Sequence, residues 1–283
     1  EHVESAWIPW SDLAATRNRG LTSHPREAAL QGIEKMRANL RLGLVQGILL
    51  PHARPDHRWL DMLATRYADA GPVLQAQALS ASAMWAANAA TVSPAPDTSD
   101  GRCHLSVANL VTMAHRSHEW PETLTQLRLA FADPAFVVHG PVPPPFGDEG
   151  AANHMRLAPE HGETGVEVFV HGLSGGPFPA RQHEEACRAI ARRHGLNPDR
   201  TLHVRQSDEA IAAGAFHNDV IAVANGPVLF AHERAFAGRD AFYAALRAAL
   251  PCVEIVEVPE SAVPLGDAIS SYLFNAQLVT PPD

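Results

Sequence analysis

The sequence predicts a mixed α/β fold. Strand-like and helical runs alternate through the second half of the chain, and Asn225-Gly226-Pro227 separates two of the strand-like runs, where Asn-Gly is a strong hairpin signal. The chain has 283 residues, of which 46% are hydrophobic, so it is long and apolar enough to form a packed core. The same alternation is also typical of an open α/β sheet.

In the first half, apolar residues recur at helical spacing over residues 26–40, and residues 59–70 are expected to form a second helix. A strand-like run covers residues 45–50. Residues 86–101 contain few bulky side chains and two prolines, which predicts a loop-rich wall around a pocket.

In the second half, strands are predicted at 166–170, 201–204, 219–224, 228–231 and 252–258. A helix is predicted over 179–194, with Pro at its start and Gly past its end. Another helix is expected after Asp240, which would cap it. Phe242, Leu246 and Leu250 recur there at i, i+4 and i+8 and so share one face.

Composition excludes several classes of partner. The chain has 22 Lys and Arg against 31 Asp and Glu, a formal charge of -9, which argues against nucleic acid or an anionic membrane. Its apolar stretches are too short to span a membrane, and its first residues lack the features of a signal peptide, so we expect a cytoplasmic protein. Three cysteines without CxxC spacing predict free thiols rather than disulfides or a Cys-rich zinc site.

Residues 146–154 carry the clearest candidate chemistry. Asp148 and Glu149 lie between glycines and are followed by small residues. A carboxylate that must meet a planar cation in a narrow pocket needs small neighbours. A glycine-rich turn with solvated acids is the alternative interpretation.

Two other segments point to the same kind of site. Residues 216–220 place His217 and Asp219 at i, i+2, which on a strand would put both side chains on one face. Residues 80–91 form a run of small residues that includes Asn88. A hydrogen-bonded structural histidine is the alternative for His217.

Together these segments resemble the N-succinylarginine dihydrolases, a branch of the guanidine-modifying (pentein) superfamily. The resemblance covers about residues 16–278, and further similar blocks follow in the family's order at 95–98, 107–110, 115–117, 179–182 and 271–275. It implies a pentein-type α/β propeller of repeated ββαβ units, incomplete here and formed by a single partial domain over residues 1–283.

A guanidinium group is planar, presents five N–H donors and stays protonated, so an enzyme that hydrolyses it must hold it with carboxylates. In the family a Cys thiolate attacks the guanidinium carbon, a His protonates the departing ammonia and then activates water, and a Glu orients the guanidinium. The implied reaction converts N2-succinyl-L-arginine and two waters into N2-succinyl-L-ornithine, two ammonia and carbon dioxide. It implies no metal and no organic cofactor.

The resemblance assigns these roles to residues of this chain. Glu149 matches the catalytic acid, His217 the catalytic histidine and Asp219 a substrate-binding acid. The two substrate carboxylates call for arginines. The matching substrate-binding positions are Asn88, His115, Arg116 and Arg181. For either arginine taken alone, a surface salt bridge is the alternative.

The chain departs from the family pattern at two places. The family's nucleophile lies in an Asn-Gly-Gly-Gly-Pro-Ala-Cys segment downstream of residues 271–275, and this sequence ends at Asp283 without it. We expect Cys103, Cys187 and Cys252 to be buried or incidental thiols. Residues 7–13 contain Trp and Pro where the family has a small-residue substrate loop, so no substrate role is assigned there.

Two other hypotheses remain open at this stage. One is an inactive relative that binds succinylarginine or another arginine derivative. The other is a metal site built from His115, His118 and Glu119, which lie at i, i+3 and i+4. The sequence indicates no further ligand for such a site, and the HExxH order is absent. A homo-oligomer is a candidate assembly on which the sequence does not decide.

Overall fold

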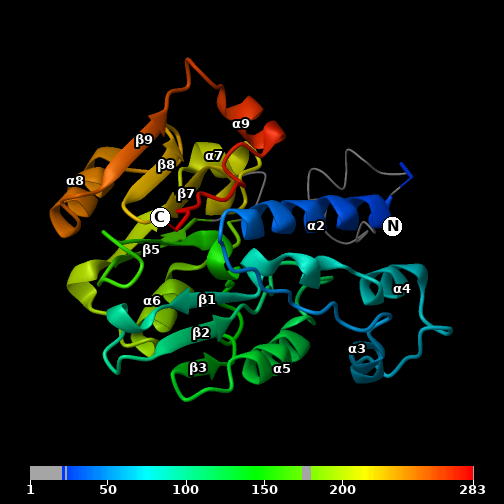
Figure 1. Ribbon diagram of the computed structural model, residues 1–283. Helices are drawn as coiled ribbons and strands as arrows, with labels where there is room; N and C mark the ends of the chain where they lie inside the picture. The colour runs from blue at the N-terminus through cyan, green and yellow to red at the C-terminus, as the bar shows by residue number, and fades with distance from the viewer. Residues whose placement is uncertain (1–20, 23, 174–179, 283) are drawn as a thin grey trace. The chain divides into compact units, whose positions relative to one another are not determined.

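The computed structural model describes residues 21–22, 24–173 and 180–282 of the chain (Figure 1). Its contacts divide the chain into two compact units, one formed by Glu1–Met84 with Val279–Asp283 and the other by Trp85–Leu278. The divergent segment 7–13 lies outside the described residues, as does Pro179 at the start of the predicted helix 179–194.

The first unit contains helices α2 (Pro25–Arg41), α3 (His57–Met62) and α4 (Pro72–Ala78). Helix α2 confirms the prediction for 26–40. The prediction of one helix over 59–70 is wrong beyond Met62, because Ala64 takes a left-handed conformation with φ 54° and Pro72 begins a new helix. The run 45–50 forms no strand, and Val45 and Ile48 are exposed rather than packed.

The second unit repeats one arrangement three times (Figure 1). In each three-stranded sheet the first two strands are antiparallel, and the third strand follows a helix and pairs parallel to the second. The three ββαβ groups are β1 (Ala90–Ser93), β2 (Cys103–Val107), α5 (Trp120–Ala130) and β3 (Phe136–His139); β4 (His154–Leu157), β5 (Val166–His171), α6 (Glu184–Arg193) and β6 (Thr201–Arg205); β7 (Ala222–Asn225), β8 (Val228–His232), α8 (Arg239–Ala249) and β9 (Glu254–Val258).

The other elements after α4 precede, connect or follow the strands of the three groups. They are helices α7 (Asp208–Ala212) and α9 (Leu265–Ser271) and the 3-10 helices η1 (Ser82–Met84), η2 (Ala86–Asn88), η3 (Ala95–Asp97), η4 (Gly150–Asn153), η5 (Pro198–Arg200) and η6 (Asn218–Val220), of which η1 belongs to the first unit. Two of the 3-10 helices, η4 and η6, directly precede the first strands of the second and third sheets. They therefore lie where the chain passes from one ββαβ group to the next.

The predicted mixed α/β class is confirmed, as three small sheets rather than one open sheet. Strands β5 and β6 and the β7–β8 hairpin lie where the sequence places them. Strand β1 falls inside the wall predicted at 86–101, and β2, β3 and β4 were also not predicted. In β1 and β2 the buried positions include the polar residues Thr91, Ser93, His104 and Ser106, so burial there does not follow an apolar pattern that the sequence shows.

Several predicted boundaries are wrong. Helix α6 begins at Glu184 rather than at residue 179, and the His183 side chain caps it. The helix ends before Gly195, as expected, and Gly195 takes a left-handed conformation. Helix α8 is preceded by Gly238, so Asp240 lies in its first turn and does not cap it. Residues 219–221 belong to η6 and its end rather than to a strand, and β9 begins at Glu254 rather than at Cys252.

The core of the second unit has three parts. Apolar side chains of α5 pack against β1 and β2, and those of α6 pack against β5. A larger cluster joins the second and third sheets with α7, α8 and α9. Phe242, Leu246 and Leu250 all belong to this cluster, which confirms the predicted buried face of α8.

His194, at the end of α6, forms hydrogen bonds to two strands of the first sheet. Its Nδ1 lies 2.9 Å from Oγ of Ser93 at the end of β1, and its Nε2 lies 2.9 Å from Oγ of Ser106 in β2. The side chain is completely buried, and burial lowers its pKa to about 2. The neighbouring His139 and His104 rings act in the same direction. The imidazole is therefore neutral in the folded protein.

No helix in the described part of the chain is long and apolar enough to cross a membrane. All three cysteines are free thiols, as the sequence predicts.

The buried neutral His194 predicts a loss of stability in acid. Its folded pKa lies below the ordinary value, so below about pH 6.5 the unfolded chain binds a proton that the folded chain does not. The free energy of unfolding should therefore fall by up to about 1.4 kcal/mol per pH unit as pH decreases from there. Denaturant unfolding between pH 7 and 4.5 should show a shallower slope, by about one proton, for His194→Gln.

His161→Gln is the matched control, because this histidine is exposed, and it should keep the wild-type slope. Equal slopes for wild type and His194→Gln would contradict the assignment of a neutral His194 in the fold.

Candidate functional site

Glu149 is the centre of the candidate site. It lies just before η4 and is completely buried. Its Oε1 accepts a hydrogen bond from Thr112 Oγ1 at 2.7 Å, and its Oε2 lies 2.9 Å from His217 Nε2 and 2.9 Å from Arg116 Nη2. Each carboxylate oxygen thus has partners of its own, a neutral hydroxyl on one side and an imidazole and a guanidinium on the other.

Glu149 is ionised in this setting. Burial by itself would raise its pKa, but the Arg116 guanidinium and the hydrogen bond from His217 outweigh burial and hold the pKa well below its usual range. Arg181 contributes in the same direction. A buried ionised carboxylate can in turn polarise or orient a cationic ligand at this point.

The main chain of Glu149 is fixed as firmly as its side chain. Its N–H donates to Gln182 Oε1 at 2.7 Å, and its carbonyl accepts from Asn88 Nδ2 at 2.8 Å. The predicted site residue Asn88 is therefore in the site, at the end of η2, where it contacts Glu149 through the backbone.

The loop after β2 supplies Thr112 and Arg116. Asn109 ties this loop to the segment before Glu149, because its Nδ2 donates to the Phe146 carbonyl at 2.7 Å and its Oδ1 accepts from the Asp148 N–H at 2.9 Å. Leu110 then takes a left-handed conformation with φ 52°, and its N–H donates to the Asp148 carbonyl at 3.0 Å. These bonds bring two distant segments together at Glu149.

The glycines beside the two acids serve close backbone packing, which differs from the expectation that they open space for a substrate. A Cβ at position 147 would lie 2.6 Å from the Arg181 carbonyl oxygen. Gly150 has φ 70°, and a Cβ there would lie 3.2 Å from the Ala87 carbonyl oxygen. The alternative of a turn with solvated acids is wrong, because Asp148 and Glu149 are both completely buried.

His217 and Asp219 also come together, although not on a strand. His217 precedes η6 and Asp219 lies within it, so the prediction of one shared strand face is wrong. His217 Nδ1 lies 3.9 Å from Asp219 Oδ1, while Asp219 Oδ2 accepts from Asn275 Nδ2 at 3.0 Å. Burial raises the pKa of Asp219, and His217 and Arg116 oppose that shift.

The predicted anion-binding arginines are both in the interior. Arg116 and Arg181 are 7% and 5% exposed, which excludes the surface salt bridge considered for them. The Arg181 guanidinium carbon lies 4.4 Å from the centre of the Phe216 ring. Phe216 directly precedes His217 in the chain. His115 is half-buried beside Arg116.

Asp148 differs from its neighbour although it is equally buried. Burial raises its pKa to about 6, since its side-chain partners are the Gly150 N–H and the Gln182 amide rather than a cation. Gln182 thus bridges the Asp148 side chain and the Glu149 main chain, with its Nε2 3.1 Å from Asp148 Oδ1.

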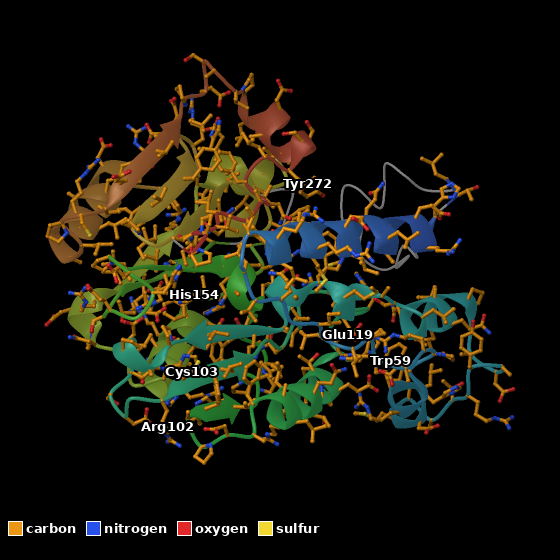
Figure 2. The ribbon with its side chains drawn as sticks, in the orientation of Figure 1. Trp59, Arg102, Cys103, Glu119, His154 and Tyr272 are labelled. Carbon is orange, nitrogen blue, oxygen red and sulfur yellow. The ribbon has the colours of Figure 1, made fainter. Side chains whose placement is uncertain are left out.

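Of the three thiols, only Cys187 contacts a residue of this site, Gln182. Cys187 is buried in α6 3.5 Å from Gln182 Nε2, and burial raises its pKa to about 12. Burial also raises the pKa of Cys103 at the start of β2 (Figure 2), and Cys252 is exposed before β9. None of the three is a hydrogen-bond or ion-pair partner of Glu149 or His217, which agrees with the expectation that they are incidental.

Three residues of the site are absent from the predicted set, namely Thr112, Gln182 and Asn275. Gln182 and Asn275 belong to blocks that carried the family resemblance, so the sequence contained a signal for them. Thr112 carried none, because its role depends on a contact with a residue 37 positions away.

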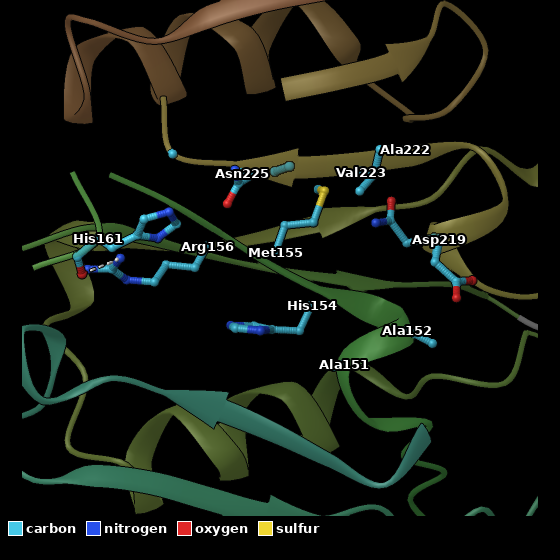
Figure 3. A pocket seen from close by; sticks show the side chains of 13 residues that line it. Ala151, Ala152, His154, Met155, Arg156, His161, Asp219, Ala222, Val223 and Asn225 are labelled. Carbon is cyan, nitrogen blue, oxygen red and sulfur yellow. Dashed lines mark hydrogen bonds between the residues drawn. The ribbon is translucent and has the colours of Figure 1, made fainter. Parts of the chain in front are cut away.

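A cavity of about 280 Å³ opens beside Asp219, between β4 and β7 (Figure 3). Asp219 lies at one end of the cavity and the pair of Arg156 and His161 at the other. Glu149 and His217 do not line it. Among the described residues no group of three His, Cys, Asp or Glu side chains is placed to hold a metal ion, His115, His118 and Glu119 included.

Comparison with known sequences gives a consistent result. The model of the succinylarginine dihydrolase family matches residues 6–283. An N-succinylarginine dihydrolase of Sphingopyxis alaskensis is 67% identical over 278 residues, which cover 98% of this chain and 67% of that protein. One from Novosphingobium aromaticivorans is 62% identical over 98% of this chain and 67% of that protein. The chain thus spans about two thirds of the length of these relatives.

Solved structures of low sequence identity share the fold. The substrate-bound N-terminal domain of ArgZ, an arginine dihydrolase from cyanobacteria, is 17% identical, with a TM-score of 0.53 over 89% of this chain and 69% of that chain. The apo structure of ArgZ is 16% identical, with a TM-score of 0.54 over 90% of this chain and 31% of that chain. The mixed α/β arrangement of small sheets is therefore a fold that this chain shares with ArgZ.

Substitution of Gly147 tests the close backbone packing at the site. Gly147→Ala should lower the free energy of unfolding by about 1 to 3 kcal/mol, because its Cβ would force the Arg181 backbone to move. Gly140→Ala is the control, since nothing lies within 4 Å of its added Cβ, and it should change stability by no more than about 0.5 kcal/mol. Urea unfolding measures both, and equal losses would show that the 147–181 contact is not what requires glycine.

Proposed function

Because the chain belongs to the succinylarginine dihydrolase family, we propose that it carries the acid, the histidine and the substrate-binding residues for hydrolysis of N2-succinyl-L-arginine. In the proposed reaction two waters are consumed and all three C–N bonds of the guanidinium carbon are broken, because the carbon leaves as carbon dioxide and the third nitrogen stays on ornithine as its side-chain amine. The products are N2-succinyl-L-ornithine, two ammonia and carbon dioxide, and the proposal requires no cofactor. The relatives that carry this enzyme name support it.

The observation that carries the proposal is the ionised Glu149 between His217 and Arg116. A guanidinium is a planar cation with donors on several sides, so it can be held between two carboxylates. Glu149 and Asp219 are two such acids, and His217 lies between them with one ring nitrogen toward each.

From this position His217 can transfer a proton to the nitrogen that leaves as ammonia and later accept one from water. Glu149 stabilises the protonated form of the imidazole, because its Oε2 accepts from Nε2. The family chemistry also uses a thiolate that attacks the guanidinium carbon, and Cys103, Cys187 and Cys252 are not placed to supply it.

The other end of the proposed substrate has two carboxylates, for which Arg116 and Arg181 are the proposed partners, with His115 and Asn88 beside them. Both arginines are nearly buried, so an anion paired with either one is shielded from water.

Further parts of the proposal concern the whole protein. We propose that the three ββαβ groups belong to a pentein-type propeller and that residues 1–283 form part of a single domain. We also propose a cytoplasmic location and, as a candidate assembly, a homo-oligomer.

Ligand binding tests the substrate assignment directly. Isothermal titration calorimetry should show tighter binding of N2-succinyl-L-arginine than of arginine, by about tenfold or more, since the succinyl carboxylate adds a charge-assisted pair. Arg181→Ala should remove most of this preference, whereas Arg188→Ala should retain it, because Arg188 is exposed and pairs with Glu184 within α6. Equal affinity of the wild type for the two ligands would refute the proposed anion site.

Ammonia release tests the position of the thiols. We expect this chain to bind N2-succinyl-L-arginine without releasing ammonia above background, because no thiolate lies beside Glu149 and His217. A coupled ammonia assay measures the rate. Release that persists in His217→Ala but disappears in Cys187→Ser or Cys252→Ser would contradict both the site and the dismissal of these thiols.

A further inference from the structure

Asp219 has two oxygens in different environments. Oδ2 accepts a hydrogen bond from Asn275 Nδ2 at 3.0 Å. Oδ1 is buried, faces His217 Nδ1 at 3.9 Å and accepts no hydrogen bond from any described residue. A buried carboxylate oxygen without a donor is costly, so its orientation toward the site must be enforced by something else.

Asn275 is well placed to enforce it, although its own side chain is exposed. The preceding residue, Phe274, is completely buried, and its ring centre lies 4.7 Å from that of Phe230 in β8. The Asn275 N–H also donates to the Tyr272 carbonyl at 3.1 Å, where Tyr272 ends α9 in a left-handed conformation. The amide is thus held at the end of a short segment that is anchored in the core.

The two carboxylate oxygens of Glu149 also have different kinds of partner. There a neutral donor, Thr112 Oγ1, holds Oε1, while Oε2 is directed at His217 and Arg116. Both acids of the site therefore have one oxygen fixed by a neutral donor from another segment and one oxygen on the His217 side.

We propose that Asn275 is a positioning residue, which holds Oδ2 of Asp219 so that Oδ1 stays directed into the site for the cationic end of the ligand. This inference rests on the proposed function for the identity of that ligand. Without Asn275 the Asp219 carboxylate can rotate about its terminal bond, because no other described residue donates to it. The consequence is a loss of selectivity for the charged guanidinium group rather than a loss of the fold.

Titration of the ligand-free protein tests the anchoring by itself. The charged groups that act on Asp219 are His217, Arg116 and Glu149, and the hydrogen bond from Asn275 favours its ionised form. In carbon-13 NMR the Asp219 carboxyl midpoint should rise by about 0.5 to 1 pH unit in Asn275→Ala, and by more in Asn275→Asp, which adds a like charge. Ser270→Ala is the control, because the Ser270 hydroxyl bonds only within α9, and it should leave the midpoint unchanged.

Calorimetry with two probes tests the role toward the ligand. N2-succinyl-L-citrulline keeps the anionic end of N2-succinyl-L-arginine but replaces the guanidinium with a neutral ureido group. Asn275→Ala should weaken binding of succinylarginine by about fivefold to tenfold and leave that of succinylcitrulline unchanged. Circular dichroism melts should match those of the wild type, since Asn275 is exposed.

An unchanged Asp219 midpoint in Asn275→Ala overturns the proposal, and so does an equal loss of affinity for both probes or no loss for either. If the wild type binds neither probe, the proposed function fails. The titration then decides whether Asn275 positions Asp219.

Discussion

The candidate site depends on one buried charge, the ionised carboxylate of Glu149. Taking a carboxylate out of water costs several kcal/mol unless cations and hydrogen-bond donors replace the water. Arg116 provides the opposite charge, the His217 imidazole a hydrogen bond to the same oxygen, and Thr112 the neutral donor on the other oxygen. These partners come from the first ββαβ group and from the connection to the third, whereas Glu149 begins the second. The charge therefore links three parts of the chain, in addition to the hydrogen bonds that Asn88, Asn109 and Leu110 make to the segment around Glu149.

The backbone around the acids makes this convergence possible. The side chain of Asn109 and the main chain of Leu110 hold the loop after β2 against Asp148, and Gly147 lets the Arg181 backbone approach closely. Few residues at these positions fit, because each satisfies a main-chain group or a steric limit rather than a surface preference. The arrangement is consequently rigid before any ligand arrives, which is the condition for electrostatic stabilisation of a charged group.

Periodicity predicted those elements whose pattern is long enough to recognise, such as the buried face of α8 and the hairpin at Asn225-Gly226. It failed for β1, where the polar residues Thr91 and Ser93 are buried and Ser93 has His194 at the end of α6 as its partner. The family resemblance singled out Glu149 and His217 as candidates. It did not predict the 3-10 turn that sets the positions of His217 and Asp219. Thr112 could not be predicted at all, since a lone threonine in a loop gives no indication of a partner 37 residues away.

Asp148 and Glu149 show that partners, rather than depth, decide the charge of a buried acid. Both side chains are completely buried. The Arg116 guanidinium and the hydrogen bond with His217 hold the pKa of Glu149 low, whereas burial raises that of Asp148 to about 6, because the hydrogen bonds from the Gly150 N–H and the Gln182 amide offset burial only in part. The negative charge of Glu149 itself contributes to the rise at Asp148. Below about pH 6 the two adjacent buried acids thus carry one charge rather than two, and that charge is on the residue that faces His217.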